Sequence, residues 1–138
     1  MTAKQYLRQL AKLELNIRIL SDELEERRTR LTSTAAPPLG DKVQSSPRGD
    51  AFAAALAALA DKDLQRQQLI WAYETLRDEI VDRIIGMDDP LQGRVLYDRY
   101  VKRKRWDVIA EDMHYNRQHV CRIHGNALVT FAKKYLDE

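Results

Sequence analysis

Hydrophobic residues recur with a heptad period along the first thirty residues. Alternating intervals of four and three separate eight positions, of which seven are apolar. These positions are Tyr6, Leu10, Leu13, Ile17, Leu20, Leu24, Arg27 and Leu31. An apolar seam of this kind predicts a helix, from about Thr2 to Leu31, that packs along its length on a partner helix.

A second long helix is predicted from Asp50, a suitable N-cap, to about Ile85, with Gly86 just beyond its end. Its apolar positions follow a similar seam: Phe52, Leu56, Leu59, Ile70, Tyr73, Ile80 and Ile84. Residues 33–49 hold three of the four prolines and two of the five glycines, so we expect a mobile linker there. An antiparallel hairpin is the simplest way to bury both seams. Association of the helices between chains is the alternative.

Three shorter helices are predicted after residue 88. Asp89 and Pro90 suit the first positions of a helix over 90–103, with Leu91, Val95, Leu96 and Tyr100 facing inward. An amphipathic helix over 106–113, a turn over 114–116 and a last helix over 117–136 follow. The last helix has Val120, Ile123, Ala127, Phe131 and Tyr135 on its inward side.

The spacing from Ile109 onward is typical of a helix-turn-helix. Small Ala110 allows two helices to cross closely, and Ile109, Met113, Val120 and Ile123 form a small core. Asn116 is a good N-cap for the second helix. His114 stands where glycine is usual but accepts positive φ, and Arg105 gives the first helix no capping side chain. The alternative is a helix pair within a bundle.

The predicted fold is therefore all-α, with two domains. Residues 1–86 would form a coiled-coil-like helical hairpin, and residues 87–138 would form the helix-turn-helix. Low glycine and proline counts, five and four residues, agree with a helical chain.

The net charge of +2 conceals an asymmetry. Residues 1–89 carry −2 and residues 90–138 carry +4, with the densest run at Lys102 to Arg105. A basic end of this kind indicates a polyanion partner, although a solvated basic loop would look the same. No apolar run is long enough to span a membrane, the start lacks a signal sequence, and one cysteine fits a reducing compartment, so we expect a cytoplasmic protein without a membrane partner.

The second helix of the predicted motif carries the candidate chemistry. With Val120 and Ile123 inward, its exposed stripe holds Arg117, Gln118, Cys121 and Arg122. Arginine suits guanine and glutamine suits adenine in the major groove. We therefore expect base contacts from Arg117, Gln118 and Arg122. The expected phosphate contacts are Lys102, Arg103, Lys104, Arg105, His119 and Cys121.

A metal site or an enzyme is not expected. His114, His119 and His124 all lie near Cys121, but no second cysteine or carboxylate pattern completes a tetrahedral set. Cys121 has no accompanying base or glycine-rich oxyanion turn, and no phosphate-binding loop spacing occurs. The sequence therefore predicts no metal, no cofactor and no catalytic residue.

Residues 91–136 resemble region four of bacterial sigma factors. The residues that carry this resemblance are Leu96-x-x-Arg99-Tyr100, Val108-Ile109-Ala110, Val120-x-x-Ile123 and Ala127-Leu128. The whole chain is similar to small phage-encoded sigma-like regulators, related to late-gene activators of the ArpU and RinA type. It shares with them the start, Thr2 to Leu7, and the run from Arg117 to Leu128.

This resemblance implies a sequence-specific, DNA-binding regulator of phage or prophage transcription in a bacterial host cell. By analogy with region four, Arg117, Gln118 and Arg122 match base-reading positions, whereas Cys121 replaces a usually basic residue. Double-stranded DNA, host RNA polymerase and a second copy bound through the long helices are the expected partners. The alternatives are a DNA-packaging recognition subunit like a small terminase, and a structural coiled-coil protein.

Overall fold

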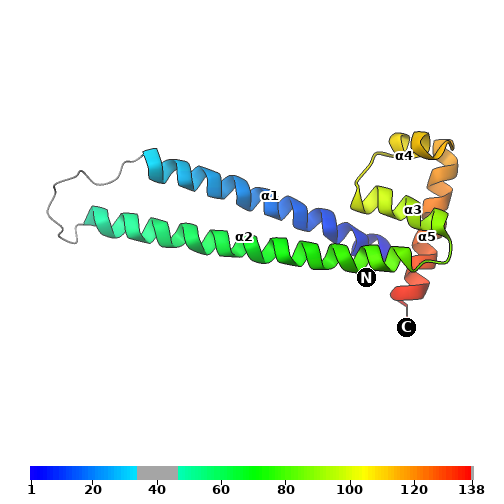
Figure 1. The fold of residues 1–138 in the computed structure, drawn as a ribbon, viewed down its shortest axis with the longest axis horizontal. Coiled ribbons are helices and arrows are strands. Elements are labelled where there is room, and N and C mark those ends of the chain that lie inside the picture. Colours follow the sequence, from blue (N-terminus) through cyan, green and yellow to red (C-terminus); the bar gives the residue numbers. More distant parts are fainter. Residues whose placement is uncertain (34–46, 138) are drawn as a thin grey trace. The chain divides into compact units, whose positions relative to one another are not determined.

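The computed structural model describes residues 1–33 and 47–137, and this part of the chain contains helices and turns but no strand. The prediction of an all-α chain is confirmed. In chain order the elements are α1 (Ala3–Ser33), α2 (Pro47–Ile85), α3 (Pro90–Leu96), the π-helical turn η1 (Tyr97–Val101), α4 (Trp106–Met113) and α5 (Arg117–Tyr135) (Figure 1).

Both long helices reach further than their sequence patterns indicate. Ser33 still belongs to α1, and α2 begins at Pro47, so the linker predicted over 33–49 was too wide. Proline fits the first turn of a helix because the amide hydrogen it lacks would have no partner there. Asp50 is therefore not the N-cap but a residue of the first turn, where its charge favours the helix dipole. The rest of the predicted linker, residues 34–46, lies outside the described residues.

The chain divides into two compact units. One combines residues 1–13 with 72–138, and the other comprises residues 14–71. The division falls within both long helices. The reason is that the first turns of α1 and the last turns of α2 share a core with the C-terminal helices.

This shared core surrounds the fully buried Phe131 of α5. The first turns of α1 contribute Leu7 and Leu10, and the last turns of α2 contribute Ile80 and Ile84. At its edge, the Tyr6 ring lies 5.8 Å from that of Phe131, and its hydroxyl donates to Glu79 Oε1 at 2.8 Å. Burial of this apolar set is the main stabilising contribution in the unit.

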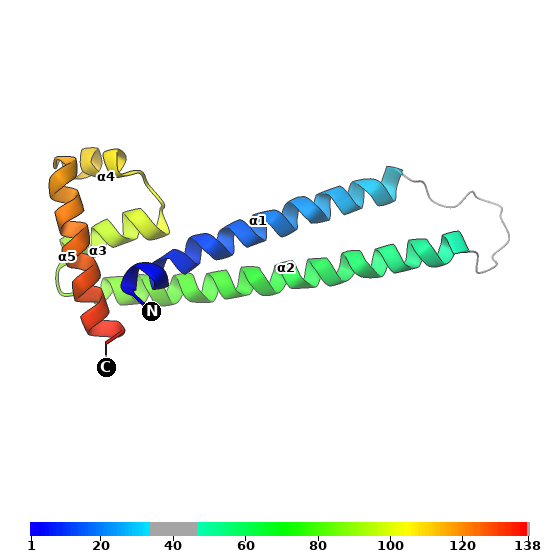
Figure 2. The same cartoon turned by 180° about the vertical axis from the view of Figure 1, so that it is seen from behind.

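Within residues 14–71, α1 and α2 run antiparallel, as both views show (Figures 1 and 2). Arg66 Nε donates to Ser21 Oγ at 2.8 Å, and Arg28 Nη2 lies 3.9 Å from Asp63 Oδ1. Later residues of α1 thus contact earlier residues of α2. Among the described residues of this unit, only Leu24 is buried.

We predict that Gly86→Ala destabilises the protein by about 1 kcal/mol. A Cβ atom at Gly86 would lie 2.6 Å from the hydroxyl oxygen of Tyr135, which donates to the Arg83 carbonyl. The tyrosine would have to move and lose this hydrogen bond. Urea unfolding followed by circular dichroism measures the change.

Gly125→Ala is the matched control, because a Cβ atom there meets no atom within 4 Å. Alanine should stabilise this position of α5 by about 0.5–1 kcal/mol through its higher helix propensity. Equal effects of the two substitutions would contradict the close contact at Gly86.

Candidate nucleic-acid interface

The turn between α4 and α5 has the local chemistry that its sequence predicts. His114 ends α4 in the left-handed conformation, with φ 59° and ψ 37°. The Asn116 side chain caps α5 by accepting a hydrogen bond from the His119 amide at 2.7 Å. Both predictions are confirmed, and together they fix where α5 starts.

A small apolar cluster joins α3, α4 and α5. Its buried members are Val95, Ile109, Ala110, Val120 and Ile123, with Trp106 and Met113 packed against it. The sequence predicts most of this set, but Leu91 was wrongly expected to face inward, since its side chain is 36% exposed. The cluster leaves the first turns of α5 anchored on one side and open to solvent on the other.

The helix predicted over 90–103 is interrupted. Regular α-helix ends at Leu96, and η1 follows with a hydrogen bond from the Lys102 amide to the Tyr97 carbonyl. This wider turn places Leu96, Tyr100 and Val101 together in the core around Phe131. This hydrogen bond spans one residue more than an α-helical one, and the basic run begins at its donor, Lys102.

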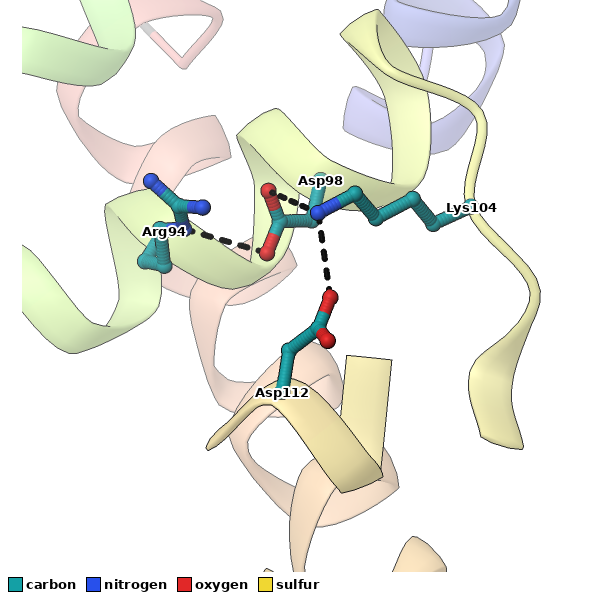
Figure 3. A network of polar contacts seen from close by, with 4 residues as sticks. All are labelled: Arg94, Asp98, Lys104 and Asp112. Carbon is teal, nitrogen blue, oxygen red and sulfur yellow. Dashed lines mark hydrogen bonds and ion pairs between the residues drawn. The ribbon is translucent and has the colours of Figure 1, made fainter. Parts of the chain in front are cut away.

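Asp98, in this wide turn, is the one buried charged residue of the described chain (Figure 3). Arg94 Nε donates to its Oδ2 at 3.1 Å, and Lys104 Nζ lies 3.8 Å from its Oδ1. Lys104 Nζ also donates to Asp112 Oδ2 of α4 at 3.1 Å. The two lysine contacts link η1 to α4 through a charge-assisted network.

The same residues shape the basic run at 102–105. The Lys104 amide donates to the Asp98 carbonyl at 2.9 Å, and Arg99 Nη1 donates to the Lys104 carbonyl at 3.0 Å. Arg103 adopts positive φ, 57°. The basic run therefore forms a turn that is held by hydrogen bonds. In it Lys104 points toward carboxylates, whereas Lys102, Arg103 and Arg105 are exposed.

Arg99 is a candidate that sequence reasoning missed as a site residue. Its guanidinium carbon lies 4.5 Å from the centre of the Trp106 ring, a cation–π contact. It also lines a cleft of about 290 Å³ together with Arg105, Trp106, Asp107 and Arg117. Three arginines from three different segments thus meet at one opening, which no sequence spacing reveals.

The exposed face of α5 contains the predicted base-reading residues. Arg117, Gln118, Cys121 and Arg122 are all exposed. No hydrogen bond, ion pair or ring contact engages the side chains of Arg117, Gln118 or Arg122 within the described part of the chain. His119 is half-buried, with its ring 4.6 Å from that of Tyr115. The structure therefore brings together three unengaged polar side chains, while His119 lies at their edge.

His124 belongs to an aromatic contact with Tyr100 and Trp106. Its Nε2 lies 2.8 Å from the Tyr100 hydroxyl, and the Trp106 ring packs edge-on against it at 4.6 Å. Burial, assisted by the positive charges of Lys4, Arg99 and Arg8, lowers the pKa of His124 to about 4. In the described residues no group of three or more His, Cys, Asp or Glu side chains could hold a metal ion.

We predict that His124 remains neutral down to about pH 4, as an NMR titration of its imidazole would show. Because its pKa in the folded protein lies below the ordinary histidine value of 6.5, protons bind more readily to the unfolded chain. The contribution of His124 to stability is then fully present above about pH 6.5 and is lost as the pH falls toward 4. A His124→Gln variant should lack this part of the pH dependence, and a titration midpoint near 6.5 would refute the burial argument.

We predict that Asp98→Asn destabilises the protein by about 2 kcal/mol, because it removes the charge that Arg94 and Lys104 face. Asp107→Asn is the control, since Asp107 pairs with Arg105 at 3.4 Å on the exposed surface. This control should change the free energy of unfolding by less than about 0.5 kcal/mol. Urea titrations that gave equal losses would contradict a structural role for the Asp98 network.

Comparison of the chain with models of protein families, with curated proteins and with solved structures finds no match in any of the three. Among the described helices, none has an apolar stretch long enough to cross a membrane.

Proposed function

We propose that the protein binds double-stranded DNA through a helix-turn-helix formed by α4 and α5, with α5 in the major groove. The observation that carries this proposal is the exposed, unengaged group of Arg117, Gln118 and Arg122 at the start of a helix anchored by a buried cluster. Arginine and glutamine are the side chains that pair bidentately with guanine and adenine. A rigid helix start bearing them is suited to reading base edges.

The surroundings of this helix start favour a negatively charged ligand. Residues 90–138 carry a net +4, and Arg99, Arg105 and Arg117 line one cleft beside the start of α5. Exposed Lys102, Arg103 and Arg105 provide phosphate contacts that position the helix. Lys104, held by Asp98 and Asp112, contributes by fixing the shape of this turn.

We further propose that DNA binding regulates transcription, as the resemblance to sigma region four and to phage regulators implies. The protein would then act in the cytoplasm of a bacterial host cell on phage or prophage promoters, with host RNA polymerase as a second partner. In this proposal the two long helices form one hairpin that carries the helix-turn-helix.

Selection from a random duplex library tests the proposal without knowledge of the operator. A sequence motif should become enriched, and Arg122→Ala should weaken binding to it about 10- to 100-fold with relaxed base preference. Arg105→Ala should weaken all sequences and reduce the salt slope by about one unit. Lys133→Ala, an exposed lysine in the last turn of α5, is the control and should change neither measurement.

Other outcomes would favour the other classes. The absence of salt-dependent DNA binding would overturn the proposal and favour a structural coiled-coil protein. DNA binding by a ring of many copies would favour a packaging recognition subunit, whose mass in solution distinguishes it from a regulator.

A further inference from the structure

Within residues 14–71, α2 has a stripe of uncharged side chains that faces solvent, apart from the face that contacts α1. It consists of Ala53, Ala57, Ala60, Leu64, Gln67, Gln68 and Trp71, all exposed, and we call it the α2 stripe. Leu64 is 55% exposed and Trp71 is 70% exposed, unusually high values for large apolar side chains. Since successive residues turn by about 100°, both lie roughly 80–100° around the helix from Asp63, which contacts α1.

The α2 stripe is apolar or neutral over its whole length. Apart from Gln68, which adjoins Gln67, its members are spaced by four and three residues in turn like a coiled-coil seam, and none of its seven side chains is charged. The antiparallel contact with α1 uses a different face, through Asp63 and Arg66.

Residue sizes along the α2 stripe are self-complementary. In one half of the stripe the side chains are small, those of Ala53, Ala57 and Ala60. In the other half they are large, those of Gln67, Gln68 and Trp71. If a second copy of α2 packs antiparallel with Leu64 opposite Leu64, Trp71 falls opposite Ala57 and Gln68 opposite Ala60. A parallel pair would instead place tryptophan on tryptophan and leave a gap between facing alanines.

Charge also favours a second copy of this chain as the occupant. Residues 14–71 contain eight Lys and Arg against nine Asp and Glu, so two copies repel each other little and the surface does not attract DNA. In the antiparallel register, exposed Asp61 lies beside Gln68 of the second copy, whose amide can donate to it, whereas the Gln67 amide donates to Asp63 Oδ2 of its own helix at 3.1 Å. No two acidic side chains between residues 57 and 71 face each other across the axis.

We propose that the α2 stripe is a homodimer contact in which α2 packs antiparallel on α2 of a second copy, with Leu64 at the two-fold axis. This inference is independent of DNA binding.

Light scattering on the full chain during size exclusion gives the mass. We expect twice the monomer mass of 16.1 kDa. Leu64→Glu places two carboxylates across the axis and should weaken the dimer at least about 100-fold, giving the monomer mass. Ile19→Glu is the matched control, an equally drastic change at a 64% exposed residue of α1, and should leave the dimer intact.

A wild-type monomer, a larger ring, or a dimer unaffected by Leu64→Glu would overturn the proposal.

Single cysteines test the register in a Cys121→Ser background, which removes the native exposed thiol. With diamide as oxidant, Leu64→Cys should form a disulfide-linked dimer, because residue 64 meets itself at the axis. Ala57→Cys and Trp71→Cys should not, because each lies 14 residues, about 21 Å, from its own copy in an antiparallel pair. Equal cross-linking at all three positions would indicate a parallel pair and refute the proposed contact.

Discussion

The buried side of α5 is the constraint on which the unit of residues 1–13 and 72–138 depends. Val120 and Ile123 complete the small cluster with α3 and α4, and Ala127 and Phe131 complete the core with the first turns of α1 and the last turns of α2. The helix α5 therefore contributes buried side chains to both apolar clusters. Since its buried positions are fixed at these points, α5 cannot rotate without exposing one of them.

This constraint determines which side chains reach solvent. With Val120 and Ile123 buried, Arg117, Gln118 and Arg122 are left on the open face. The Asp98 network then sets the adjacent basic turn, because Lys104 is bound to carboxylates of η1 and α4. Under the proposed function, a net charge of +4 in residues 90–138 would supply few phosphate contacts, so one copy alone would bind DNA weakly. A dimer through the α2 stripe would supply two reading helices and raise the effective concentration of the second.

The periodic parts of the fold could be predicted from the sequence. Apolar spacing indicated both long helices, and the residue types at His114 and Asn116 indicated the turn between α4 and α5. The prediction of helix bounds and side-chain contacts from the sequence failed where a single residue alters the course of the backbone. Asp98 and Lys104 interact across a π-helical turn, and an α-helical period cannot reveal an inserted residue. Likewise, Pro47 signals a loop by composition but begins a helix, and Arg99 meets Arg117 only in the folded chain.

The central claim is that the exposed start of α5 is the surface that meets DNA. Its most direct test is an NMR titration of the labelled full chain with a short double-stranded DNA at low salt. We expect the amide shifts of Arg117, Gln118, Arg122 and the turn at 102–105 to change first, with little change in residues 14–33 and 47–71. Shifts confined to the long helices, or no shifts at low salt, would contradict it.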